Sequence, residues 1–345
     1  MISKNFKKLI IAFLILSVIG IAVIYFQLFS SNTKFDEQET FVNIPTNAKY
    51  DQVLKILEPF VENMNKFQQV AKLRSYPEHI KSGRFSLKKG MGTFTIVTAL
   101  RQNIAIKLAF NNQDRIEDLA GRIGSQIEAD SLLLLQSFKN STFLMSNGFN
   151  EQNVISIFVP NTYEMYWNTS ADKFRDKMLK EYQNFWTSDR INEAKANNLT
   201  PIEATTLASI VHKESVKKDE RPRIAAVYLN RLKIGMPLQA DPTVIYALKR
   251  QNNDFKQVIK RVIGADLSLN SPYNTYLNLG LPPGPIAMPD ITAIEAVLKP
   301  EKNNYLFFCA SVEKFGYHEF ATTFQEHTVI ANKYREWINN QGVKR

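Results

Sequence analysis

The hydrophobic residues form one long uninterrupted block near the N-terminus and shorter periodic blocks elsewhere. Residues 9–29 carry no charge. At a helical rise of about 1.5 Å per residue, they span roughly 30 Å, the thickness of the hydrocarbon core of a bilayer. Lys4, Lys7 and Lys8 precede this block, so the positive-inside rule places residues 1–8 in the cytoplasm. The pattern predicts an uncleaved, single-pass membrane helix, with the rest of the chain outside the cytoplasmic membrane.

After this block, shorter periodic stretches predict a small mixed unit. Residues 30–40 are polar and are expected to form a linker. Within 41–107, "FVNIP" favours a strand, "YDQVLKILEPFVENMNKFQQVAKL" a helix, "SGRFSLKKGM" a strand and turn, and "TFTIVTALRQN" a second helix. The strand and turn resemble those of a LysM-like module, a glycan-binding fold. A structural spacer is the alternative interpretation of residues 41–107.

The remaining residues, 108–345, alternate helical and strand-like patterns without repeats. Residues 158–170, "FVPNTYEMYWNTS", are interpreted as an aromatic-rich loop, and 171–197 as one charged amphipathic helix. The C-terminal part predicts a helix, two strands and a final helix. Cys309, the only cysteine, lies in "YLFFCASV" and is expected to be a core residue of a buried strand. This mixture predicts an α+β fold, in which 108–345 form one domain, the larger of the two.

Charge and motif spacing narrow the classes of function. The formal net charge of +10 is spread along the chain, so a nucleic-acid partner is not favoured, and an anionic membrane surface or acidic polymer fits equally well. The four histidines have no metal-ligand spacing, no Gly-rich loop follows a strand, and no G-x-S-x-G elbow occurs. The sequence therefore predicts no metal and no organic cofactor. Acid–base chemistry by a carboxyl group remains.

One carboxylate interrupts an apolar helical stripe. Thr200, Pro201 and Glu203 form a capping box with a proline start, which predicts a helix. Steps of three and four along that helix run from Leu207 through the apolar residues 210 and 211 to Glu214. Glu214 either turns to solvent in the last helical turn or lies in a partly apolar cleft. In a cleft, desolvation would raise its pKa and make it a general acid.

Two later segments carry the polar and aromatic side chains that a sugar chain requires. Sugar rings have polar edges and apolar faces, which suit amides, hydroxyls and aromatic rings. Asp241 precedes Pro242, a pattern typical of an N-cap followed by proline, and this structural role is the alternative for that residue. The candidate sugar-binding residues are Gln239, Asp241, Thr243, Tyr246, Tyr273, Asn274 and Tyr276.

Five motifs in a fixed order carry a family resemblance. They are "LASIVHKES", "RIAAVYLNRLKIGMPLQADPTVIYAL", "SPYNTY", "GLPPGPIAMP" and "HEFATTFQEH". With the N-terminal anchor, residues 80–330 resemble the YceG-like endolytic murein transglycosylases. The resemblance implies that Glu214 is catalytic, that peptidoglycan glycan strands are the substrate, and that peptidoglycan synthases are partners. His212 stands where the family often has a second glutamate, which leaves the catalytic position unaffected.

The resemblance implies a membrane-anchored lyase that cuts the bond between N-acetylmuramic acid and N-acetylglucosamine and forms 1,6-anhydro ends. Glu214 would serve as both acid and base. Asp219 and Glu220 are expected at the start of the second helix, beside Arg221 and Pro222. Two alternatives remain: a muramidase that uses Asp241 as the second carboxylate, and a non-enzymatic peptidoglycan-binding protein.

Overall fold

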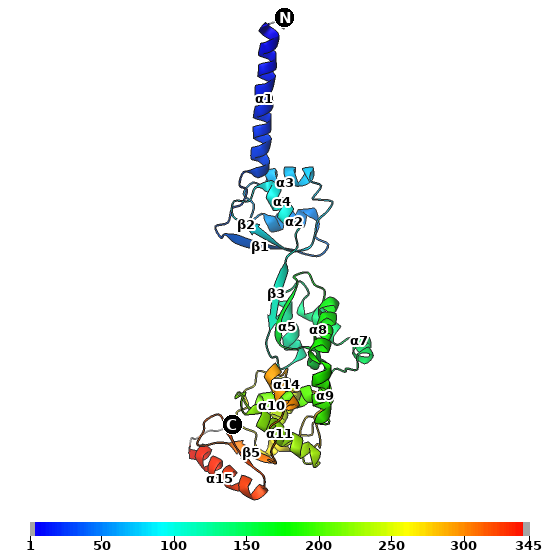
Figure 1. Cartoon of the computed structure of the whole chain (residues 1–345), viewed down its shortest axis with the longest axis vertical. Helices are drawn as coiled ribbons and strands as arrows, with labels where there is room; N and C mark the ends of the chain where they lie inside the picture. The colour runs from blue at the N-terminus through cyan, green and yellow to red at the C-terminus, as the bar shows by residue number, and fades with distance from the viewer. Residues whose placement is uncertain (1–3, 341–345) are drawn as a thin grey trace. The chain divides into compact units, whose positions relative to one another are not determined.

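A computed structural model describes residues 4–340, which divide into two compact units (Figure 1). The first unit comprises the chain up to Leu108 together with Gln126–Ala129 and Tyr163–Ser170. The second comprises Ala109–Ser125, Asp130–Thr162 and the chain from Ala171 onward. The sequence placed 126–129 and 163–170 in the catalytic domain, whereas the structure groups them with the first unit. The fold is a mixture of helices and short two-stranded sheets, as the sequence predicts.

The N-terminal helix α1 spans Lys4–Phe29. Its candidate membrane span, Phe6–Phe29, has 24 residues, and the most apolar stretch within it has a mean hydropathy of 3.0 and no buried residues. The predicted apolar helix is confirmed, and it begins five residues before the predicted start at residue 9. Its length and exposed apolar side chains suit a single membrane span.

The first unit is built on two antiparallel strands, β1 (Glu39–Ile44) and β2 (Gly83–Lys88). Three helices accompany them: α2 (Tyr50–Leu57), α3 (Met64–Leu73) and α4 (Thr93–Ala99). The sequence predicted one helix where α2 and α3 stand. The chain breaks there because Pro59 has no backbone N–H with which to continue the helical hydrogen bonds, and Asn63 then caps α3 by accepting a hydrogen bond from the Lys66 amide.

Residues 30–40 are part of the first unit and are not the free linker that their polarity suggested. Asn32 is buried, and its side-chain amide donates to the Asn63 carbonyl and the Thr93 hydroxyl, both at 3.1 Å. Its side-chain oxygen accepts from the Asn63 amide at 2.8 Å. Composition missed this role because a buried asparagine with three partners looks, in sequence, like any loop asparagine.

Two stretches after residue 100 differ from the prediction. Residues 158–170 contain a strand, β4 (Asn161–Tyr166), which pairs with β3 (Ala105–Phe110). Successive side chains of a strand point to opposite faces, so β4 has one buried face, formed by Tyr163 and Met165, and exposed residues between them. The single helix predicted at 171–197 is two helices, α8 (Ala171–Phe185) and α9 (Ser188–Ala196).

The second unit is mostly helical around one hydrophobic core. Besides α8 and α9 it contains α5 (Ile116–Gly124), α6 (Ser131–Phe138), α7 (Ser141–Ser146), the 3₁₀ turn Val154–Ile157, α10 (Pro201–Glu214), α11 (Arg221–Lys233), α12 (Asp241–Gln251), α13 (Gly264–Leu267), α14 (Ile291–Leu298) and α15 (Phe324–Asn340). Helix α10 packs against both α11 and α14 (Figure 1).

Helix α10 is the centre of this core. Every residue from Ala204 to Val211 is buried, polar ones included. The hydroxyls of Thr205 and Thr206 donate to carbonyls one turn back, so their burial leaves no polar group unsatisfied. The predicted capping box is present, with the Thr200 amide donating to Glu203 at 2.8 Å, an arrangement that typically stabilises a helix by about 1 kcal/mol.

The C-terminal part forms a small antiparallel ribbon, β5 (Phe307–Ala310) with β6 (His318–Ala321), followed by α15. Both strands and the final helix match the sequence prediction. Cys309 does not occupy a fully buried strand, however, because all four residues of β5 are half-buried. A two-stranded ribbon has only one face to pack against the core, which explains this partial exposure.

Candidate active site

Glu214 is the last residue of α10 and is half-buried. The helix that precedes it is fixed on all sides by the core, so the position of the carboxyl group is set by a rigid element. The Tyr228 hydroxyl, on α11, donates to Glu214 Oε1 at 2.5 Å. Tyr228 is itself 1% exposed. A short hydrogen bond from a buried tyrosine therefore fixes one oxygen of the carboxyl group and leaves the other available.

Desolvation dominates the electrostatics of Glu214. Burial raises its pKa to about 7, against the opposing effects of the Tyr228 hydrogen bond and the positive charges of His318 and Arg231. The negative charge of Asp241 adds to the rise. About half of the carboxyl groups with this pKa are protonated at neutral pH, whereas an ordinary glutamate is almost fully ionised there. Of the two interpretations of Glu214, the structure favours the partly apolar environment over simple exposure.

The turn after α10 is held by a second, different carboxylate. Glu220 is buried and accepts from the His318 amide at 2.7 Å, and its other oxygen lies 2.8 Å from His318 Nδ1. Burial alone would raise the pKa of Glu220, but these hydrogen bonds hold it below its usual value. Glu220 occupies the N-cap position of α11, as predicted. Its side chain makes no capping hydrogen bond to the helix and instead binds His318 on β6. Asp219 accepts from the Tyr317 hydroxyl.

Asp241 does not cap α12, which corrects the structural alternative considered for it. The N-cap residue is Ala240, and Asp241 is the first helical residue. Its side chain is solvent-exposed and accepts from the Tyr276 hydroxyl at 2.6 Å. Desolvation by the surrounding protein raises the pKa of Asp241, and the Tyr276 hydrogen bond partly offsets the rise. The carboxylate is therefore free of a capping role and close enough to influence Glu214.

The remaining candidates near Asp241 divide into exposed and buried groups. Gln239 is exposed and has a φ of +47°, a conformation that is uncommon for a residue other than glycine and often marks functional loops. Thr243 and Asn274 are fully buried. The Thr243 hydroxyl lies 2.8 Å from that of Thr275, and the Asn274 amide donates to two carbonyls. Both residues hold the loops together, and this burial does not fit the predicted contact with sugar.

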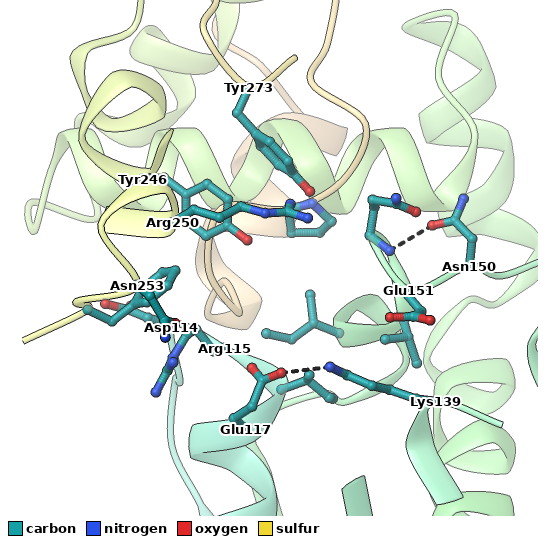
Figure 2. Close-up of a pocket in the computed structure, with 16 residues that line it drawn as sticks. Asp114, Arg115, Glu117, Lys139, Asn150, Glu151, Tyr246, Arg250, Asn253 and Tyr273 are labelled. Atoms are coloured by element: carbon teal, nitrogen blue, oxygen red, sulfur yellow. Dashed lines mark hydrogen bonds and ion pairs between the residues drawn. The ribbon is translucent and has the colours of Figure 1, made fainter. Parts of the chain in front are cut away.

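Tyr246 and Tyr273 line a separate cavity of about 660 Å³ (Figure 2). Their rings lie 4.7 Å apart between centroids. Glu214 does not line this cavity. The predicted residues thus separate into Glu214, Asp241 and Tyr276, which interact with one another, and the two tyrosines that line the cavity.

The sequence did not identify three residues that set the properties of Glu214: Tyr228, Arg231 and His318. Arg231 is 7% exposed and donates to the carbonyls of Leu238 and Leu306. A usable signal existed, because Arg231 interrupts the apolar stripe of α11 as Glu214 interrupts that of α10. His318 offered no comparable signal, since its role depends on a strand that lies about a hundred positions later in the chain.

His212 faces a different set of partners. Its Nδ1 lies 3.3 Å from Asp290, which is also paired with Arg221 at 2.7 Å. Burial would raise the pKa of Asp290, but its hydrogen bonds hold it far below the usual value. This ion cluster joins α10 and α11 to the start of α14. Within residues 4–340, no three histidine, cysteine or acidic side chains cluster as metal ligands would.

Comparisons with known proteins agree with this architecture. A family model described as the YceG-like family matches residues 42–333. An endolytic murein transglycosylase of Bacillus subtilis is 28% identical over 338 residues, which cover 92% of this chain and 91% of that protein. One from Streptococcus pneumoniae is 26% identical over 83% of this chain, which spans only 56% of that relative.

A solved structure shows the same relationship. The crystal structure of a yceG-like protein from Listeria monocytogenes matches with a TM-score of 0.56 and 27% identity. The match covers 86% of this chain and 99% of the Listeria chain. Together with the family model, which spans well over half of the residues, it leads to one conclusion: this chain belongs to the YceG-like family.

Proposed function

We propose that this protein is an endolytic lytic transglycosylase of peptidoglycan and that Glu214 is its acid and base. The names of the relatives supply the reaction class. The observation that carries the assignment to Glu214 is its pKa of about 7, at the end of a rigid buried helix beside Tyr228. Of the acidic residues in the site, it is the one whose pKa is raised to near neutrality, so a large fraction of it is protonated there, as a general acid requires.

The proposed reaction needs one carboxyl group. Because Tyr228 occupies Oε1, the other oxygen of Glu214 carries the proton, and it passes to the glycosidic oxygen as the C1–O bond breaks. The broken bond joins C1 of an N-acetylmuramic acid residue to the glycosidic oxygen. The C6 hydroxyl oxygen of that muramic residue then bonds to C1, and the hydroxyl proton returns to the Glu214 carboxylate. The nucleophile belongs to the substrate and gains a high effective concentration from its attachment. The products are a 1,6-anhydromuramic end and a free N-acetylglucosamine hydroxyl.

A specific observation also favours a second candidate, hydrolysis. Asp241 has no capping role, is exposed, and acts electrostatically on Glu214. A hydrolase requires a second carboxylate, either as nucleophile or as the base that activates water. Asp241 has the position and freedom for this role. In the lyase, the same carboxylate would stabilise positive charge that develops at C1.

The first unit and the helix α1 complete the proposal. The unit runs strand, two helices, strand, with β1 and β2 antiparallel, which supports a LysM-like, glycan-binding role. We place the N-terminus in the cytoplasm and the catalytic unit outside the cytoplasmic membrane, because Lys4, Lys7 and Lys8 precede the apolar block. Association with peptidoglycan synthases is proposed on the family resemblance.

The Glu214→Gln variant tests the acid–base assignment. Glutamine keeps the size of the side chain and still accepts from Tyr228, but it has no transferable proton. Cleavage of purified glycan strands should fall by about 10² to 10⁴, while strand binding and the thermal unfolding midpoint change little. Glu336→Gln, on exposed α15, is the matched control and should retain full activity. Cleavage by Glu214→Gln at near the wild-type rate would remove Glu214 from the mechanism.

The pH dependence of cleavage follows from the same group. The acid must be protonated, and its protonated fraction declines as pH rises through about 7, so the rate should fall about tenfold per pH unit above that value. Tyr228→Phe removes a hydrogen bond that favours the ionised form, so the pKa of Glu214 rises further and the descending limb moves to higher pH. Initial rates between pH 5 and 9 measure both profiles. An unmoved limb in Tyr228→Phe argues against this coupling.

The identity of the product ends separates lyase from hydrolase. We expect ends that are lighter by one water than reducing muramic ends, measured by mass spectrometry after digestion with the full-length chain. Asp241→Asn should then slow the reaction but leave the type of end unchanged. Reducing ends in the wild type, with activity that falls by about 10² or more in Asp241→Asn, would establish the hydrolase instead.

Membrane orientation is tested with reporters fused after Arg345. An alkaline phosphatase, which is active only outside the cytoplasm, should be active at this position because three lysines precede the apolar block. A cytoplasm-specific reporter should be inactive there. The opposite pair of results would reverse the topology and place the catalytic unit in the cytoplasm.

A further inference from the structure

The cavity of about 660 Å³ in the second unit contains charged groups that the reaction at Glu214 does not use (Figure 2). Most of its charged lining side chains are already neutralised. Lys139 pairs with Glu117 at 2.8 Å, and Asp114 pairs with Lys213 at 2.6 Å. Arg115 pairs with Asp118 at 2.7 Å. These pairs form the fixed walls of the cavity.

Two lining side chains of opposite charge have no such partner. Arg250, at the end of α12, has no carboxylate partner, and Glu151 has no cationic one, within the described residues 4–340. Figure 2 shows them on different sides of the cavity. Both are solvent-exposed. A cavity with one unpaired cation and one unpaired anion on separate walls complements a ligand that carries both charges.

A buried hydroxyl points into the same space. Tyr273 is 1% exposed, and its hydroxyl lies beside the Arg250 and Tyr246 side chains but has no acceptor in the protein for its own proton. The Arg250 guanidinium carbon lies 5.2 Å from the centroid of the Tyr273 ring, and Figure 2 shows the hydroxyl directed into the cavity near that guanidinium. An unpartnered buried hydroxyl is costly unless a ligand or water satisfies it. Tyr273 and Arg250 together form a pair of donors suited to a carboxylate.

The wall that carries Glu151 is held rigidly. A Cβ on Gly284 would lie 2.1 Å from the Gln152 carbonyl oxygen, so only glycine permits this close approach. On the other side of Gly284, the Ile286 amide donates to the buried Ser209 hydroxyl of α10 at 3.0 Å. The loop after Pro283 therefore ties the Glu151 wall to the helix that ends at Glu214.

The cavity lies next to a smaller recess whose lining includes residues adjacent in sequence to Glu214 and Asp241. A smaller recess of about 130 Å³ shares Asp114, Tyr246 and Phe255 with the cavity. The same recess is lined by Lys213 and Pro242, which are the sequence neighbours of Glu214 and Asp241. The recess therefore connects the cavity to residues that stand next to Glu214 and Asp241 in the chain.

We propose that this cavity binds the stem peptide carried by a muramic residue of the glycan strand. The inference rests on the proposed function, because peptidoglycan strands carry short peptides with free carboxylates and a free amine. The peptide carboxylate would bind Arg250 and the Tyr273 hydroxyl, and its ammonium group would bind Glu151. The protein would then distinguish peptide-bearing strands from stripped strands at a site distinct from Glu214.

Charge-matched peptides test this inference directly. The probes are a synthetic stem pentapeptide with lysine at the third position, the same peptide with its carboxylates amidated, and the same peptide with its lysine acetylated. Calorimetry with the full-length protein in detergent should show affinity about tenfold lower for each neutralised peptide, the loss expected for one charge-assisted hydrogen bond. Arg250→Gln should abolish the effect of amidation only, and Glu151→Gln the effect of acetylation only. Tyr273→Phe should weaken binding of the parent peptide and of the acetylated peptide.

Lys180→Gln and Glu336→Gln, at exposed positions of α8 and α15, are the controls and should behave as wild type. Equal effects of Arg250→Gln on all three peptides, or no binding of the parent peptide, would overturn the inference. Strand cleavage is measured separately: Arg250→Gln and Glu151→Gln should lower kcat/KM on peptide-bearing strands and leave it unchanged on stripped strands. Normal cleavage without peptide binding rejects the cavity assignment alone, and peptide binding with a fully active Glu214→Gln rejects the catalytic assignment alone.

Discussion

The hydrogen bond from Tyr228 to Glu214 is the contact on which the candidate active site depends. It joins the end of α10 to the middle of α11 and fixes one oxygen of the carboxyl group. Burial of both side chains gives Glu214 its raised pKa, and the hydroxyl limits that rise by stabilising the ionised form. An acid that must give up and take back a proton needs both effects, since either one alone would hold it in a single state.

Hydrogen bonds between buried polar groups of the surrounding elements hold α10 and α11 in place and so maintain this contact. Ser209 on α10 accepts from the loop amide of residue 286, and Thr243 and Thr275 join the start of α12 to the following loop. Arg231 donates to carbonyls on both sides of the site. Each of these groups would destabilise the fold by roughly 1–3 kcal/mol if its partner were lost. The site is therefore rigid because the core beneath it contains polar groups with fixed partners.

The sequence predicted the features of this protein that arise from local patterns. The membrane-length helix, the capping box of α10 and the interruption of its apolar stripe by Glu214 are all visible within about twenty residues. Features that depend on distant partners were missed or misplaced. Asp241 looked like a helix cap because proline follows it, yet Tyr276 holds its side chain. The strand at 161–166 looked like a loop, because its pairing partner at 105–110 lies far away in the sequence.

The candidate sugar-binding residues lie in different environments for the same physical reason. Residue type identifies groups that suit a sugar, but burial decides which of them reach solvent. Thr243 and Asn274 are buried, and Tyr273 lines a cavity that Asp241 does not line. Neighbouring positions on a helix point in different directions, so residues 241 and 246 lead to different sites although only five positions separate them.

The two carboxyl groups of the site have similar partners and different environments. Each accepts from one tyrosine hydroxyl, Glu214 from Tyr228 and Asp241 from Tyr276. Glu214 is the more enclosed of the two, and desolvation raises its pKa to about 7, whereas the Tyr276 hydrogen bond partly offsets the rise in the pKa of Asp241. The negative charge of Asp241 then raises the pKa of Glu214 further. When the environment gives two carboxyl groups different pKa values, one can act as the general acid and the other can stabilise positive charge. Whether the nucleophile is the muramic hydroxyl or water depends on which of them reaches C1, and Asp241 lies where it would affect that choice.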